Sequence, residues 1–153
     1  MVKNPETEQS PDALKAHALS QWERVNQLAA RRFCRDVVAE EAAHFVLEAL
    51  ERDNWQRLSR FQGRSSFATF FTSVVCRLLE DFARKKYGRA TPPTWLQRLG
   101  GIWMQLYRML CHERVPYRDA LELARQKNPQ THAPTLDAAA EKILAEIPHC
   151  GAH

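Results

Sequence analysis

The residues with the clearest chemical potential lie in one stretch, between positions 61 and 89. It carries hydroxyl groups near its start, Arg77 in its middle and three consecutive cations at residues 84–86. Residues 52–89 hold nine Lys or Arg against three acidic residues, a balance of +6 in a chain whose total is +4. Positive charge gathered on one segment is typical of nucleic-acid binders, because it can lie along a phosphate backbone. The alternative is a solvated helix end whose cations complement the helix dipole.

One long helix is expected to position these groups. Over residues 67–82, apolar side chains recur at the i, i+3, i+4, i+7 spacing of a helix with one face in a core. Gly63 lets the preceding loop bend, and Ser65 or Ser66 can accept a hydrogen bond from a first-turn amide. Gly88 is placed to end the helix in a left-handed cap. The face predicted to point away from the core carries Thr69, Thr72, Ser73, Arg77, Glu80 and Asp81.

The same stretch carries a recognisable pattern. Its residues are Phe61-x-Gly63-Arg64-Ser65-Ser66-Phe67-x-Thr69, Phe70, Val74, Leu78, Asp81-Phe82 and a basic run. This pattern resembles region 2 of bacterial RNA polymerase sigma factors, most closely the small extracytoplasmic-function type. In that family the run forms the loop and helix that melt and read the promoter −10 element. The resemblance is strong over residues 36–89 and weaker over 90–148.

The resemblance implies a DNA-binding surface for the −10 non-template strand. Phosphate contacts would supply affinity, and the loop at 62–67 with Arg77 would hold a flipped, unpaired base. Many family members carry an asparagine where Arg77 stands. Because arginine has only donors and a fixed charge, we expect Arg77 to grip a phosphate rather than read a base. The implied DNA-binding residues are Arg60, Gln62, Arg64, Ser65, Ser66, Phe67, Thr69, Ser73, Arg77, Arg84, Lys85, Lys86 and Arg89.

A second helix, expected over residues 36–52, shows an acidic side. By itself this is typical of a solvated face. Ala39-Glu40-Glu41 followed by His44 is similar to the family pattern that docks on the clamp helices of the RNA polymerase β′ subunit. Glu41 stands where the family favours Asp, and His44 where it favours Gln. The implied polymerase-binding residues are Glu40, Glu41, His44, Leu47 and Glu48.

The whole chain is predicted to be all-α, because glycine and β-branched runs are scarce and strong helix formers abound. We expect a disordered lead over residues 1–10 and a helical bundle like sigma region 2 over 11–89. Its first helix would run from Pro11 to about Phe33, after the Ser-Pro-Asp start signal. In the connector after the second helix, Trp55 is expected to lie in the core.

A linker at residues 90–94 and a smaller helical unit at 95–148 complete the expected organisation. One helix would begin at Thr94 and continue through Gly100 and Gly101 to Leu110. Shorter helices would follow, at residues 117–126 and 135–147. A complete sigma factor needs a further helix-turn-helix, region 4, and no second basic recognition helix is present here. Either the residues around 95–126 serve as a reduced second unit, or the chain is truncated.

Other chemistry is not supported by the sequence. Cys111-His112 and His149-Cys150-x-x-His153 contain zinc-binding residue types, but their spacing fits no standard site, so we predict no metal and no cofactor. The four cysteines lack a CxxC pair, and reduced thiols are expected. No catalytic constellation, membrane span or secretory signal is evident, so the chain is predicted to be a cytoplasmic non-enzyme.

The sequence is consistent with two functions from different classes. The leading one is a sigma-factor-like initiation protein that binds core RNA polymerase and recognises and melts the −10 element. The resemblance also leaves room for an anti-sigma factor as a further partner. The alternative is a helical protein-interaction module that keeps the region 2 fold and binds polymerase or a regulator without opening DNA.

Overall fold

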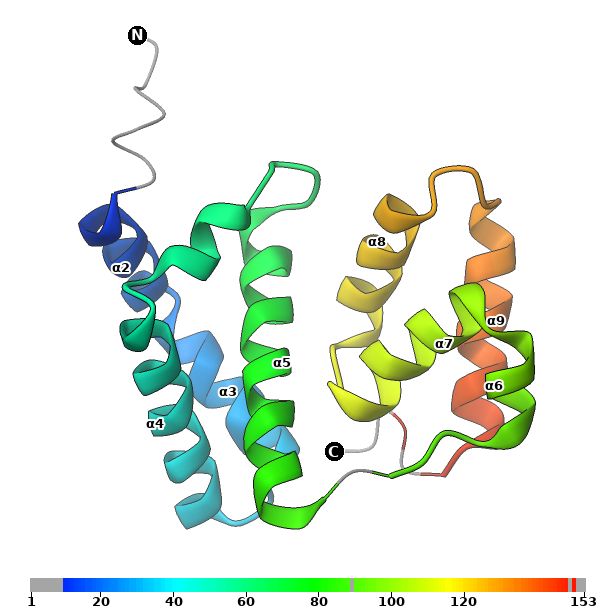
Figure 1. Cartoon of the computed structure of the whole chain (residues 1–153), viewed down its shortest axis with the longest axis horizontal. Helices are drawn as coiled ribbons and strands as arrows, with labels where there is room; N and C mark the ends of the chain where they lie inside the picture. The colour runs from blue at the N-terminus through cyan, green and yellow to red at the C-terminus, as the bar shows by residue number, and fades with distance from the viewer. Residues whose placement is uncertain (1–9, 89, 149, 151–153) are drawn as a thin grey trace, which may run out of the picture. The chain divides into compact units, whose positions relative to one another are not determined.

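The computed structural model describes residues 10–88, 90–148 and 150, and the described chain is all-α, as predicted (Figure 1). Two units form, at residues 1–79 and 80–153. The division falls inside the long helix α5 rather than in the predicted linker. The elements are α2 (Pro11–Ser20), α3 (Trp22–Arg32), α4 (Asp36–Arg52), the 3-10 helix η1 (Gln56–Arg60), α5 (Phe67–Tyr87), α6 (Thr94–Leu99), α7 (Gly101–Tyr107), the π-helical turn η2 (Arg108–His112), α8 (Tyr117–Lys127) and α9 (Ala133–Glu146).

The first helix is interrupted, contrary to the prediction of one helix from Pro11 to about Phe33. Its start is as expected, because the Ser10 hydroxyl accepts a hydrogen bond from the amide of Ala13. At the break, the Ser20 hydroxyl donates to the carbonyl of His17, 2.6 Å away, which the Gln21 amide would use in a continuous helix. The Gln21 amide bonds Ala18 instead, so α2 ends there and α3 starts afresh.

In the first unit, α3 packs along α4, and α2 contacts both α3 and η1. The buried side of α4 includes Val38, Ala42, Val46, Ala49 and Leu50. A tight turn follows, in which Asn54 and Trp55 both adopt positive φ, at 57° and 64°. Trp55 is 4% exposed, so its predicted place in the core is confirmed.

Two features fix that turn from either side. The amide of Trp55 donates to the carbonyl of Leu50 at 2.8 Å, and the Arg57 guanidinium pairs with the Asp53 carboxylate at 2.9 Å. A left-handed conformation costs roughly 1–2 kcal/mol for a residue other than glycine. Burial of the indole and these two contacts offset that cost and aim η1 at the start of α5.

In the second unit, α7 packs against α6, α8 and α9, and α8 packs against α9. The single helix predicted from Thr94 to Leu110 is wrong, because Gly100 adopts φ 58° and ψ −155° and separates α6 from α7. Leu99, at the end of α6, is 51% exposed rather than part of a continuous apolar stripe. α8 and α9 lie close to the ranges predicted for them. No helix within the described residues is both long and apolar enough to span a bilayer.

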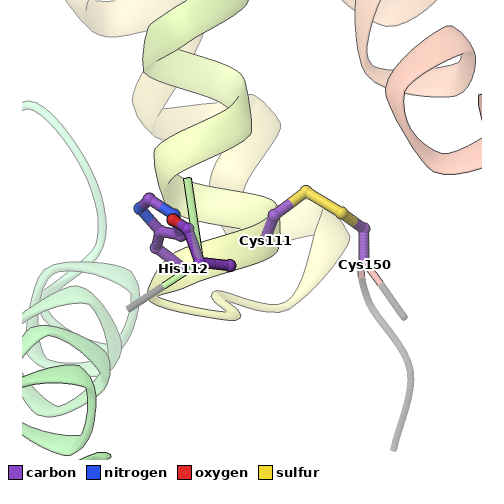
Figure 2. Close-up of a disulfide and its surroundings, with 4 residues drawn as sticks. Cys111, His112 and Cys150 are labelled. Carbon is purple, nitrogen blue, oxygen red and sulfur yellow. A yellow bond between two sulfur atoms is a disulfide. The ribbon is translucent and has the colours of Figure 1, made fainter. Parts of the chain in front are cut away.

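The expectation that all cysteines are reduced is wrong for two of them. Cys111 and Cys150, 39 residues apart, form a disulfide, whereas Cys34 and Cys76 form none. Figure 2 shows the bond joining the π-helical turn to the chain after α9. The packing of α7 on η2 and on α9 brings these segments together, which cysteine spacing cannot predict. The disulfide also removes both sulfurs from the zinc set considered above, whose His149 and His153 lie outside the described residues.

This cross-link generates a stability prediction. Reduction, or the Cys111→Ser substitution, is expected to lower the free energy of unfolding of the second unit by about 2–4 kcal/mol, because the unfolded chain regains loop-closure entropy. Urea unfolding with and without a thiol reductant measures it. Cys34→Ser, at an exposed free cysteine, is the matched control. An unchanged midpoint after verified reduction would contradict the prediction.

Candidate functional site

The loop between η1 and α5 presents its polar residues to solvent. Arg60, Gln62 and Arg64 are all exposed, and Ser65 is half-buried. Gly63 has φ 73°, a conformation that favours glycine and lets the loop reverse. The loop therefore places two cations on the surface, directly before the first turn of α5.

A cluster of aromatic rings holds this loop. Phe61 meets Phe67 edge-to-face at 5.5 Å between ring centroids, and it lies 5.4 Å from Phe70. Phe67 is nearly parallel to Phe71, with centroids 5.8 Å apart, and Phe71 is completely buried. Because Phe61 and Phe67 close the two ends of the loop, their contact fixes its span.

The start of α5 is capped as the sequence predicts, by Ser66. Its hydroxyl oxygen accepts a hydrogen bond from the amide of Thr69 at 3.1 Å and lies 3.0 Å from the Thr69 hydroxyl. This arrangement satisfies an amide that the helix itself leaves unpaired.

The polar face of α5 differs from the prediction. Thr69, Ser73 and Glu80 are each 5% exposed, and Thr72 is also buried, so the expectation that they point away from the core is wrong. The Ser73 hydroxyl donates to the carbonyl of Phe70 at 2.7 Å. Small hydroxyls that bond locally can be buried without an unpaired polar group, which a periodicity argument does not anticipate.

Arg77 keeps its predicted exposure. Along the described stretch from 71 to 80, it is the only exposed residue. The long arginine side chain can leave its stem against apolar neighbours while its guanidinium reaches solvent. The middle of α5 therefore offers one cationic group for a ligand.

The last turns of α5 carry the basic run. Arg84 pairs with Asp81 at 3.1 Å, and the Lys86 ammonium lies over the Phe82 ring at 5.7 Å. The ion pair is solvent-exposed, where such a pair contributes about 0–1 kcal/mol, so it holds Arg84 only weakly. Lys85 is exposed, and Gly88 ends the helix at φ 83°, as predicted. Arg89 lies outside the described residues.

The acidic residues of α4 form a second surface. Glu40, Glu41, His44 and Glu48 are exposed, and Leu47 is half-buried. The His44 Nε2 atom lies 2.9 Å from a carboxylate oxygen of Glu48. All five predicted residues therefore occur on the solvent side of one helix.

Two residues near these surfaces were not singled out from the sequence. Val37, a turn before Glu40 and Glu41, is 69% exposed and adds an apolar element to the acidic face. His17 stacks on Phe67, 50 positions along the chain. Val37 stands at helical spacing from Glu40 and Glu41, and this spacing was a possible sequence signal for it. No periodic pattern links His17 to the loop.

Residues 90–148, which follow α5, carry seven Lys or Arg against six Asp or Glu, so their charge is nearly balanced. α9 carries Asp137, Glu141 and Glu146 against a single Lys142. Burial and then the Glu141 and Asp137 carboxylates raise the pKa of Tyr117 on α8, although Arg125 acts in the opposite direction. Carboxylates of α9 therefore act on the Tyr117 phenol of α8.

The geometry thus offers two surfaces in the first unit. One is the basic loop with its aromatic cluster, and the other is the acidic face of α4. Comparison of the chain with protein-family models, with curated proteins and with solved structures found no match in any of the three.

Proposed function

We propose that this chain is a sigma-factor-like transcription initiation protein that binds core RNA polymerase and recognises and melts the promoter −10 element. The observation that carries the proposal is the exposed basic loop at residues 60–66, held on an aromatic cluster at the start of α5. Cations beside aromatic rings are the combination that unpaired nucleic acid requires, since phosphates need charge and bases need stacking surfaces.

Phosphate contacts would supply most of the affinity in this mechanism. Arg60 and Arg64 would bind the backbone at the loop, and Arg77 with the 84–86 run would bind it along α5. Arg77 and Arg84 are seven residues apart, so they lie on one face of the helix, roughly 10 Å apart along its axis. Thr69 and Ser73, being buried, would support the site rather than touch DNA.

The loop would also receive an unpaired base. Unstacking and unpairing a base costs a few kcal/mol, so an opened strand must gain comparable contacts on the protein. Gln62, with both a donor and an acceptor, and Ser65 can bond a base edge, and the half-buried Phe67 offers apolar surface. In this proposal the cations supply affinity that does not depend on sequence, and the loop residues that bind the base favour the opened strand.

The acidic face of α4 is the proposed docking surface for polymerase. Its exposed carboxylates suit a partner surface that carries positive charge, and Val37 and Leu47 add apolar contact. Residues 95–148 are proposed to bind protein or to act as a reduced second unit, and an anti-sigma factor is a candidate partner for the chain.

The second candidate function is a protein-interaction module that keeps this fold without opening DNA. The burial of Thr69 and Ser73 favours it, because two of the polar groups expected at the DNA are not available. The two candidates share the polymerase surface and differ in the loop, so DNA binding distinguishes them.

The polymerase surface is tested by charge reversal. Glu41→Lys is expected to weaken binding to core polymerase with little loss of stability, because Glu41 is exposed. Co-purification with core enzyme measures it, with Glu23→Lys on α3, also exposed, as the matched reversal. A folded Glu41→Lys protein that binds core as well as the parent would remove this face from the interface.

The basic run is tested by its salt dependence. Replacing Arg84, Lys85 and Lys86 with glutamine is expected to flatten the plot of log affinity against log salt, by about 0.7 for each lost phosphate contact on single strands. The same replacement of three exposed cations outside α5 is the control, at Arg98, Arg118 and Lys127. An equal slope in both triple variants would assign the run to helix-dipole compensation alone.

Substitutions of Arg77 test the proposed recognition of the −10 element. The protein is expected to prefer single-stranded −10-type oligonucleotides over duplex. Arg77→Ala should weaken all of them nearly alike, and Arg77→Asn should restore some discrimination between bases. Binding across the four bases at the flipped position measures it. A loss confined to one base would give Arg77 a base-reading role, and absence of single-strand preference would favour the protein-interaction module.

A further inference from the structure

Three rings from two distant segments form a stack at the loop. His17 of α2 lies on Phe67 with centroids 3.6 Å apart and planes inclined by 14°. Phe67 in turn is parallel to Phe71 within 16°. Exposure rises outward along this series, from the fully buried Phe71 through the half-buried Phe67 to the exposed His17.

The outer face of the histidine ring is therefore the accessible end of the stack. Phe67 covers one face of the imidazole of this exposed residue, so a ligand can approach the ring only from its other face and its edges. Parallel stacking at this separation leaves a flat surface that a further planar ring can extend. Nucleobases are the planar ligands that stack on such surfaces irrespective of sequence.

The position of this ring is fixed by the packing of its helix. Leu14 and Ala18, on the same helix, are buried, and α2 contacts η1, which ends at Arg60. The Ser20 hydroxyl also bonds the carbonyl of His17. A ring held in this way loses little conformational entropy when a ligand stacks on it.

Charge and rings occur together here. Arg60 directly precedes Phe61, which contacts Phe67, and Arg64 lies three residues before Phe67. The cations that would hold the phosphates therefore belong to the segment on which His17 stacks. A base attached to such a phosphate has a stacking surface within the same site.

We infer that the outer face of His17 is a stacking platform for an unpaired nucleobase of the strand bound by the loop. This inference rests on the proposed function and adds to it a residue from α2, outside the region that carries the family resemblance. His17 would supply no sequence reading. It would hold an opened base out of the duplex and so lengthen the single-stranded segment that the protein retains.

The test compares two substitutions that both cover Phe67. His17→Phe keeps a ring, whereas His17→Leu keeps apolar contact without one. The full chain is titrated with a single-stranded −10-type oligonucleotide containing one 2-aminopurine, moved position by position, and with a duplex of equal length. His132→Ala, at an exposed histidine before α9, is the matched control, and thermal unfolding confirms that each variant is folded.

The parent protein and His17→Phe are expected to quench 2-aminopurine at one position. His17→Leu should lose that quenching and bind the single strand about 5- to 150-fold more weakly, the range expected when one base loses its aromatic partner. Duplex binding should be unchanged. Equal affinity and quenching in the Phe and Leu variants would overturn the inference and leave the proposed function intact. Failure of the parent protein to prefer single strands would overturn both.

Discussion

The candidate DNA surface depends on the burial of a single ring. Phe71 is completely inaccessible, and Phe67 packs parallel to it. Phe67 then contacts Phe61 at the other end of the loop and stacks with His17. The loop that carries the exposed arginines contains a positive-φ glycine and has no secondary structure of its own. Its conformation therefore depends on the ring contacts. Loss of the Phe67 ring would leave the loop and its arginines without a fixed conformation.

Opposite charges are kept on different helices of the first unit. The acidic residues lie on the exposed side of α4, and the cations follow η1 and continue into α5. Charge of one sign gathered on one surface steers a partner of the other sign, so two such surfaces can select two different partners without competing. This separation is compatible with the two partners proposed above.

The sequence predicted the parts of this structure that local rules govern. α4 and α5 begin and end where periodicity, Ser66 and Gly88 place them, because packing and capping agree there. The break at Gln21 was missed because a hydroxyl, not an apolar residue, competes for the carbonyl of His17. The buried hydroxyls of α5, the disulfide and the stacking of His17 were missed for one shared reason. Each depends on contacts or packing that spacing along the chain does not reveal.

The connector between α4 and η1 links the acidic face of α4 to the basic loop and limits how the chain between them can change. Asn54 and Trp55 both occupy left-handed conformations, and the indole is buried, so an inserted or deleted residue would displace Trp55 from the core and rotate η1. Charged side chains on α4 and in the loop meet solvent and tolerate exchange. Exchange of these surface side chains is therefore expected to leave the connection intact, whereas a change in the number of residues between α4 and η1 is expected to disrupt it.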